Sequence, residues 1–344
     1  MLKERLHCGR IFFRGDCMKP VLVILIFFAA LIFLLFAGCF IAMRVIFFNP
    51  PAADRENTKP DPLLGGENLA KVIKQVDAAT EKIKRLYPYQ TVSVKTDDGL
   101  TLYGDFYENQ RLTKNTFLCV HGYNSAGYYE FATMVEPILK GGYNCFLINQ
   151  RKAPPSEGKH TGFGVLEKKD LLKWIEALNS LVPDGRIILY GVSMGGATVM
   201  QASEFELKNV VGIIEDCGYT SCWEEFRFVL KTVAHLPAFP ILNVMNLLCK
   251  IFLKFDLKSS DSRKAVAKTS LPMLFVHGDA DAFVPEDMSH ECYEACQGKK
   301  QIIIFPKAAH AQSHFTHPER YESALLGFAD ECIRSAVEKE KETV

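Results

Sequence analysis

The sequence predicts an α/β fold, with a mostly parallel central sheet and helices on both of its faces. Between residues 115 and 337, short apolar runs typical of buried strands alternate with longer segments of helical periodicity. One such run, at residues 187–190, passes directly into a glycine-rich turn and then a helix-compatible segment. Strands that alternate with helices pair in parallel, because each connection crosses back over the sheet.

A hairpin is expected at the start of the domain. Residues 91–96 and 100–107 alternate apolar and polar side chains around Asp98-Gly99, a pair typical of tight hairpin turns. The remaining elements then follow in order. Strands are expected at 116–120, 145–148, 187–190, 210–214, 272–277 and 301–305, and helices at 128–139, 166–178 and 318–337.

The chain is long enough for one large domain and an appendage. It has 344 residues, of which 48% are hydrophobic and 23% charged. Its 40 basic residues balance its 40 acidic residues, so the composition does not indicate a nucleic-acid partner.

The appendage is an apolar N-terminal segment. Residues 21–43 contain no charged side chain and are long enough to cross about 30 Å of hydrocarbon as a helix. A buried core helix would keep a polar face, and the apolar region of a signal peptide is shorter. Ala37-Gly38-Cys39 resembles a lipoprotein cleavage site, but apolar residues continue past it. The segment therefore predicts a transmembrane helix.

Charge asymmetry predicts the orientation of this helix. Five basic residues precede the span, whereas only Arg44 follows it closely. The positive-inside rule places residues 1–20 in the cytoplasm and the domain outside, in a single-pass protein of the cell membrane. Eleven cysteines oppose this placement. We interpret them as buried free thiols, because Cys119 and Cys145 fall within expected strands.

Residues 49–66 form a linker rich in proline, and the domain occupies residues 67–344. The domain opens with helical periodicity over 67–86, where apolar side chains form one stripe. We expect this helix to pack on the domain, although a helix on the membrane surface is the alternative.

Residues 219–270 interrupt the alternation of strands and helices and carry many large apolar side chains. An ordinary extra helical pair would explain this. The interpretation we favour is a helical cap whose apolar face covers the site and binds acyl or other apolar groups.

The turn after residues 187–190 has the pattern G-x-S-x-G, from Gly191 to Gly195. This pattern is typical of a nucleophile elbow, in which small neighbours allow a strained serine to stand above the sheet. Ser193 would then lie at a helix N-terminus, where backbone N–H groups favour developing negative charge.

A nucleophilic serine needs a histidine base and an acid that orients it. Two later strand ends supply candidates, HGDADAFVP from His277 and PKAAH, which ends at His310. The carboxyl ends of parallel strands meet at one edge of a sheet, so both loops should lie near the elbow. Asp279 and Asp281 are both candidate acids at this point.

The chain resembles the α/β-hydrolase superfamily, and most closely its bacterial membrane-anchored serine hydrolases related to serine aminopeptidases and acyl esterases. The matching segments, spread over residues 90–338, are HGYNSAG, NQRKAPPSEGKHTGFG, GVSMGG, HGDADAFVP and AAHAQS. The resemblance implies an α/β-hydrolase fold, with Ser193, Asp281 and His310 as the catalytic triad. It also implies an oxyanion hole formed by the N–H groups of Tyr123 and Met194.

Some alternatives stay open beside this resemblance. Asp279 is a turn-forming rival to Asp281, and Asp216 occupies an alternative acid position of the superfamily. The Asp-x-Arg-x-His-Gly-x-Ser loop common in the family is replaced by residues 149–156, which leaves the structure of that loop open.

The predicted function is hydrolysis of a carboxylic ester by a serine hydrolase, with a small-molecule ester or amide as the substrate. An amidase or peptidase with the same triad is one alternative, and a membrane-tethered binding protein with a relic triad is another. We expect no cofactor. We also expect no metal, because the cysteines form no Cys-x-x-Cys pair with partner ligands.

Overall fold

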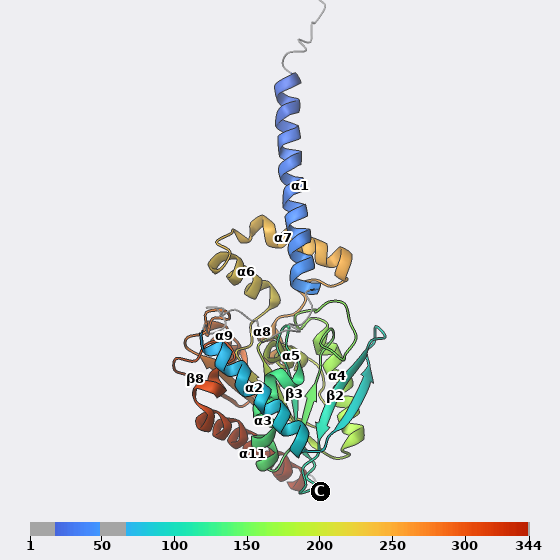
Figure 1. Cartoon of the computed structure of the whole chain (residues 1–344), viewed down its shortest axis with the longest axis vertical. Helices are drawn as coiled ribbons and strands as arrows, with labels where there is room; N and C mark the ends of the chain where they lie inside the picture. The colour runs from blue at the N-terminus through green and yellow to red at the C-terminus, as the bar shows by residue number, and fades with distance from the viewer. Residues whose placement is uncertain (1–17, 49–66, 343–344) are drawn as a thin grey trace, which may run out of the picture.

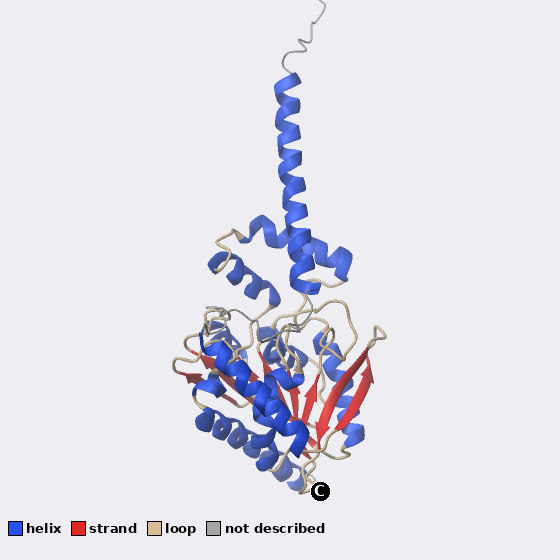
Figure 2. Ribbon diagram, in the orientation of Figure 1, coloured by secondary structure: helices blue, strands red, loops and turns tan. Residues whose placement is uncertain are grey.

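An eight-stranded sheet forms the centre of the protein in the computed structural model, which describes residues 18–48 and 67–342 (Figure 1, Figure 2). The strand order is β1-β2-β4-β3-β5-β6-β7-β8. The β1–β2 hairpin and the β2–β4 pair are antiparallel, and the other neighbours are parallel. The expected mostly parallel sheet is confirmed.

The elements lie close to their predicted positions. The strands are β1 Gln90–Lys95, β2 Thr101–Tyr107, β3 Asn115–Val120, β4 Asn144–Ile148, β5 Arg186–Val192, β6 Val210–Asp216, β7 Met273–Gly278 and β8 Lys300–Phe305. The helices of the body are α2 Glu67–Leu86, α3 Gly127–Lys140, α4 Glu167–Leu181, α5 Met194–Ala202, α8 Ser262–Val266, α9 Asp287–Ala295, α10 Ser313–Thr316 and α11 Pro318–Glu342.

Helices cover both faces of the sheet, as the alternation in sequence predicts. Along β3, Phe117 and Cys119 belong to the core beneath α2, α3 and α11, whereas Leu118 and Val120 belong to the opposite core beneath α4, α5 and α9. Successive strand residues point to opposite faces, so each inner strand supplies both cores. This accounts for apolar runs without a polar alternation.

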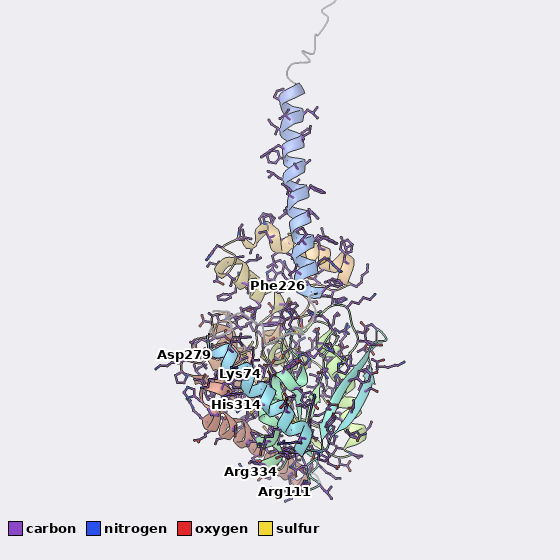
Figure 3. The ribbon with its side chains drawn as sticks, in the orientation of Figure 1. Lys74, Arg111, Phe226, Asp279, His314 and Arg334 are labelled. Atoms are coloured by element: carbon purple, nitrogen blue, oxygen red, sulfur yellow. The ribbon has the colours of Figure 1, made fainter. Side chains whose placement is uncertain are left out.

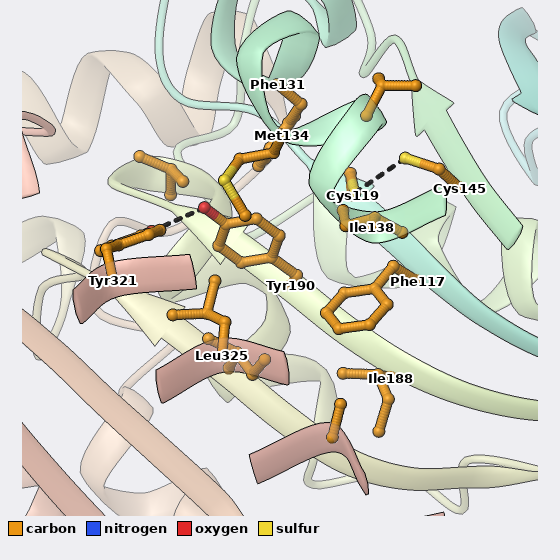
Figure 4. Close-up of a cluster of buried hydrophobic side chains, with 14 of the residues drawn as sticks. Phe117, Cys119, Phe131, Met134, Ile138, Cys145, Ile188, Tyr190, Tyr321 and Leu325 are labelled. Carbon is orange, nitrogen blue, oxygen red and sulfur yellow. Dashed lines mark hydrogen bonds between the residues drawn. The ribbon is translucent and has the colours of Figure 1, made fainter. Parts of the chain in front are cut away.

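Tyrosine hydroxyls close the first of these cores (Figure 4). The Tyr190 and Tyr321 hydroxyls are 2.6 Å apart, and Tyr321 donates to Asp216 Oδ2 at 2.6 Å. Burial raises the pKa of Asp216 to about 6, although the Tyr321 hydrogen bond opposes the rise. The sulfur atoms of Cys119 and Cys145 are 3.9 Å apart in the same core. Each cysteine that the structure describes is buried and free.

The N-terminal segment is a single helix, α1, at Met18–Phe48. It is long and apolar enough to cross a membrane, judged by length and composition. The helix continues past the predicted end of the span at residue 43, and Cys39, Met43 and Phe47 are buried in its last turns. The predicted linker, residues 49–66, and most of the predicted cytoplasmic segment, residues 1–20, lie outside the described residues.

The region predicted as a cap forms α6 Cys222–Thr232, α7 Ala238–Leu248 and the short π-helix η2 Cys249–Leu253. We call these elements the cap. They lie beside the base of α1, between its free part and the body (Figure 1). α8, which also falls within residues 219–270, packs on α5 and α9 and so belongs to the body.

Candidate active site

Ser193 stands on a tight turn between β5 and α5. Its φ of 56° and ψ of −119° lie in a region that non-glycine residues rarely adopt. A Cβ atom added to Gly191 would lie 2.2 Å from the Gly195 carbonyl oxygen, and one added to Gly195 would lie 1.8 Å from that of Val120. Only glycine fits at either position. The N–H of Ser193 donates to the Asp216 carbonyl at 2.8 Å, which anchors the turn to β6.

The structure brings Ser193, His310 and Asp281 into one hydrogen-bonded chain. Ser193 Oγ lies 2.9 Å from His310 Nε2, and His310 Nδ1 lies 2.7 Å from Asp281 Oδ2. The serine follows β5, the aspartate follows β7 and the histidine follows β8. Parallel strands deliver all three loops to the same edge of the sheet, as the sequence predicts.

Asp281 is held from several sides. Its Oδ1 accepts the N–H groups of Phe283 and Val284, each at 2.9 Å, and its side chain is fully buried. Burial alone would raise its pKa, but the imidazoles of His310 and His277 outweigh burial and hold the pKa well below its usual range. The carboxylate is therefore ionised at neutral pH, as the orienting partner of a histidine must be.

His277 is a second imidazole on the same carboxylate. Its Nε2 lies 3.3 Å from Asp281 Oδ2, and its Nδ1 lies 2.8 Å from Ser289 Oγ. Ser289 in turn donates to Glu215 at 2.9 Å. Burial acts to lower the pKa of His277, but the Asp281 carboxylate more than offsets this and raises it. Sequence reasoning treats His277 as a strand-end residue and misses this contact, which only the folded loop creates.

The other candidate acids have different partners. Asp279 is exposed and accepts the N–H of Lys307 at 2.5 Å, as a turn-forming aspartate does. Asp216 is buried, and Tyr321 donates to it. His310 Nδ1 is hydrogen-bonded to Asp281. The geometry therefore favours Asp281 as the acid.

The loop that carries Tyr123 passes directly beside the serine. A Cβ atom added to Gly122 would lie 3.3 Å from Ser193 Cβ. His121 fixes the loop, because its Nε2 accepts the N–H of Gln150 at 2.9 Å. Met194, the other expected oxyanion donor, is the first residue of α5. Both expected donors thus lie on backbone that adjoins the serine.

The loop that departs from the family pattern is nonetheless well braced. Arg151 is buried and donates twice to Asp170, at 2.7 and 2.8 Å, and also to Asp98. Lys152 donates to the side chain of Asn124 at 2.8 Å, next to Tyr123. Burial lowers the pKa of Lys152 to about 8. Arg151 thus holds this loop to the body, and Lys152 joins it to the loop that carries Tyr123, without the His-Gly pair.

Comparison with known families agrees with this geometry. A model described as the alpha/beta hydrolase fold matches residues 115–234, which contain the elbow. A model described as a serine hydrolase (FSH1) matches residues 248–316, which contain Asp281 and His310. The chain has the α/β-hydrolase fold and is similar to serine hydrolases.

Relatives and solved structures extend this assignment. The uncharacterized protein YqkD of Bacillus subtilis is 26% identical over 225 residues, which are 63% of this chain and 72% of YqkD. The uncharacterized membrane protein YNL320W of Saccharomyces cerevisiae is 24% identical over 226 residues, 65% of this chain and 74% of that protein. The Pyrococcus furiosus esterase Pf2001 superimposes with a TM-score of 0.60 at 23% identity, covering 72% of this chain and 93% of the esterase. The hydrolase class and the resemblance to the superfamily are confirmed.

A cavity of about 400 Å³ opens beside Ser193. Ser193 and His310 line it on one side, and α2 lines it on the other through Leu69, Val72, Ile73 and Val76. Phe283 and Phe315 add aromatic surface. The cavity is therefore largely apolar next to the serine, as an acyl-binding site would be.

Residues 219–270 do not line this cavity in the described parts of the chain, and covering of the site by the cap stays a prediction. Apolar side chains of the cap pack against the last turns of α1, and Phe226 of α6 belongs to the same apolar cluster as Met194. α2, which we expected only to pack on the domain, does so through Val76 and Ile83 and also forms the wall.

Cys217 is the nearest residue that could join the site as a metal ligand. Its sulfur lies within 4.8 Å of ligand atoms of Asp281 and His310. Those two side chains are already hydrogen-bonded to one another, and burial raises the pKa of the Cys217 thiol well above its usual value. A protonated thiol is a poor ligand, so the arrangement suits a triad better than a metal site.

Proposed function

We propose that this α/β hydrolase cleaves a carboxylic ester through Ser193, His310 and Asp281. The observation that carries the proposal is the continuous chain from Ser193 Oγ to His310 at 2.9 Å and on to Asp281 at 2.7 Å. His310 is the base that takes the serine proton as Oγ attacks the ester carbonyl. Asp281 holds the imidazole in the tautomer that leaves Nε2 free to accept that proton.

The N–H groups of Tyr123 and Met194 are the proposed oxyanion donors. They would stabilise the negative charge that develops on the carbonyl oxygen, with help from the positive end of α5. His310 then returns its proton to the leaving alcohol, and an acyl group remains on Ser193. A water molecule, deprotonated by the same histidine, releases the acid and restores the serine.

Two observations favour an ester with an apolar acyl group over an amide. Apolar side chains of α2 and two phenylalanines contribute to the lining of the cavity beside Ser193, together with polar residues such as Asn124, Glu130 and Gln312. One solved structure with a similar fold, Pf2001, is named as an esterase. The proposed substrate class is therefore a small ester whose acyl chain lies along α2.

We further propose that α1 anchors the enzyme in the cell membrane by a single pass. The helix is apolar over the length needed to span a bilayer. The basic residues before residue 21 favour a cytoplasmic N-terminus and a body outside the cytoplasm. The yeast relative named as a membrane protein is consistent with an anchor.

Replacement of the nucleophile tests the reaction. Ser193→Ala should lower kcat by roughly five to six orders of magnitude, because the attacking oxygen is lost, and should abolish labelling by a fluorophosphonate probe. Ser203→Ala, another buried serine at the end of α5, is the matched control and should label normally. Undiminished labelling of Ser193→Ala would place the nucleophile elsewhere.

Replacement of the acid tests the assignment of Asp281. Asp281→Asn should lower kcat on the order of 10⁴-fold, because the amide favours the wrong histidine tautomer. Asp279→Asn should lower kcat far less, since the Asp279 carboxylate accepts the N–H of Lys307 in its turn and does not contact His310. Steady-state hydrolysis of a chromogenic ester by the two variants checks this ranking. The reverse order would move the acid to Asp279.

Narrowing of the cavity tests the acyl site. Ile73→Trp should shorten the cavity and lower kcat/KM for long acyl esters, by roughly tenfold if two methylenes are excluded, while acetyl esters react normally. Lys74 is the next residue on α2 and is exposed (Figure 3), so Lys74→Trp is the matched control. A chain-length series of esters provides the measurement. Equal losses for all chain lengths would contradict an acyl site along α2.

Protease treatment tests the orientation. Protease added to intact cells should remove the body and leave a short membrane stub, because the basic residues hold the N-terminus inside. Immunoblotting before and after lysis gives the readout. A body that is cut only after lysis would place it in the cytoplasm.

A further inference from the structure

The cap carries a cluster of exposed apolar side chains. Outside α1, the large apolar residues that are exposed in the described chain are Leu86, Tyr89, Leu112 and six in the cap region, Val233, Leu236, Phe239, Leu247, Ile251 and Phe252. The side chain of Phe239 is among the most exposed, since the residue retains 76% of its accessible surface. Soluble surfaces rarely gather such residues without a partner.

The length of α1 indicates that membrane lipid covers this cluster. Lys19 and the charged residues before it set the lower limit of the span in sequence. Residues 20–34 are exposed on all sides, but at 1.5 Å per residue these fifteen residues cover only about 22 Å. A bilayer has about 30 Å of hydrocarbon. The remaining 8 Å or so must therefore include the turns of α1 that begin at Leu35.

Those turns of α1 are the ones that touch the cap. Leu34, Leu35 and Gly38 line an apolar cavity of about 420 Å³ together with residues of α6 and α7 and with Leu236 between them. Farther along α1, the ring of Phe40 lies 5.5 Å from that of Phe252. Any position of the membrane that lets α1 span it therefore brings lipid chains to the level of the cap (Figure 1, Figure 3).

Basic side chains border the apolar cluster. Lys231 precedes it, and Lys250 and Lys254 flank Ile251 and Phe252. All three lysines are exposed, although Lys250 forms an ion pair with Asp256 at 2.7 Å. Lysines at the edge of an apolar face are typical of helices that lie in a membrane interface, where the ammonium groups reach the phosphates. The charge pattern of the cap thus fits a phospholipid surface.

We propose that the exposed apolar side chains of the cap region, from Val233 to Phe252, are embedded in the hydrocarbon of the membrane beside α1. This rests on the proposed anchoring by α1. The embedded cap and the spanning helix then form one unit, and the body is held close against the membrane surface. Three contacts connect the end of α1 to the candidate site. The Tyr123 hydroxyl donates to the Ile46 carbonyl at 2.5 Å. The Tyr123 ring stacks on Phe163, which in turn packs on Phe47.

Tryptophan quenching in full-length protein provides the test. The Phe239→Trp variant is placed in phosphatidylcholine vesicles with and without brominated acyl chains. The emission of the wild-type protein, which comes from Trp174 and Trp223, is subtracted from that of the variant. Leu112→Trp is the matched control, because Leu112 is also 76% exposed but lies in the β2–β3 connection of the body. Phe252→Trp provides a second cap probe, which lies on η2 instead of α7.

Embedding predicts a blue-shifted emission for both cap tryptophans that brominated chains quench, and an unquenched, red-shifted emission for Leu112→Trp. Cap tryptophans that are not quenched, in protein that alkaline carbonate does not extract, would overturn this proposal and leave the anchor intact. Extraction of the protein by carbonate would overturn the anchor as well. A blue shift without quenching that vanishes on dilution into excess lipid would assign the face to a second copy and overturn embedding. Fluorophosphonate labelling of the same samples reports the proposed catalytic function separately.

Discussion

The Ser193 backbone occupies a conformation that costs on the order of 1–3 kcal/mol for a non-glycine residue, and its N–H is held by the Asp216 carbonyl at 2.8 Å. Three parallel strands make this turn possible. β5 delivers the serine, β6 supplies the carbonyl, and β3 approaches so closely that only glycine fits at position 195. Because the turn is fixed on all sides, Ser193 Oγ meets His310 without a rearrangement. The rest of the site is arranged around this one strained residue.

Electrostatic interactions stabilise the charge of the buried Asp281 carboxylate. Asp281 is buried, a condition that disfavours a charged carboxylate, yet two imidazoles and two backbone N–H groups stabilise its charge. His310 faces the serine, whereas His277 faces inward to Ser289 and Glu215. The inner imidazole therefore lets an ionised acid exist deep in the protein. The outer imidazole remains available for proton transfer.

The N-terminal helix α1 packs against the cap and forms hydrogen bonds with the body near the candidate site. Its last turns are buried in the cap, and two of its final carbonyls accept hydrogen bonds from the body, Ile46 from the Tyr123 hydroxyl and Phe47 from the Thr161 N–H. Tyr123 is also the residue whose N–H is the proposed oxyanion donor. Buried apolar side chains of the cap pack against the last turns of α1, and α2 lines the cavity beside Ser193. The proposed anchor and the candidate active site are thus parts of one packed structure.

The order of strands, helices and candidate site residues could be predicted from the sequence, because local signals specify each of them. Apolar runs give the strands, G-x-S-x-G gives the elbow, and loops after parallel strands must meet at one edge of the sheet. The sequence alone left Asp279 and Asp281 open as the acid, and the family resemblance added Asp216 as an alternative. Only the tertiary structure placed Asp281 on His310, His277 behind it, and α2 on the wall of the cavity beside Ser193. These placements depend on contacts between segments far apart in the chain, and an apolar stripe such as that of α2 or the cap indicates that a face is buried but not which partner buries it.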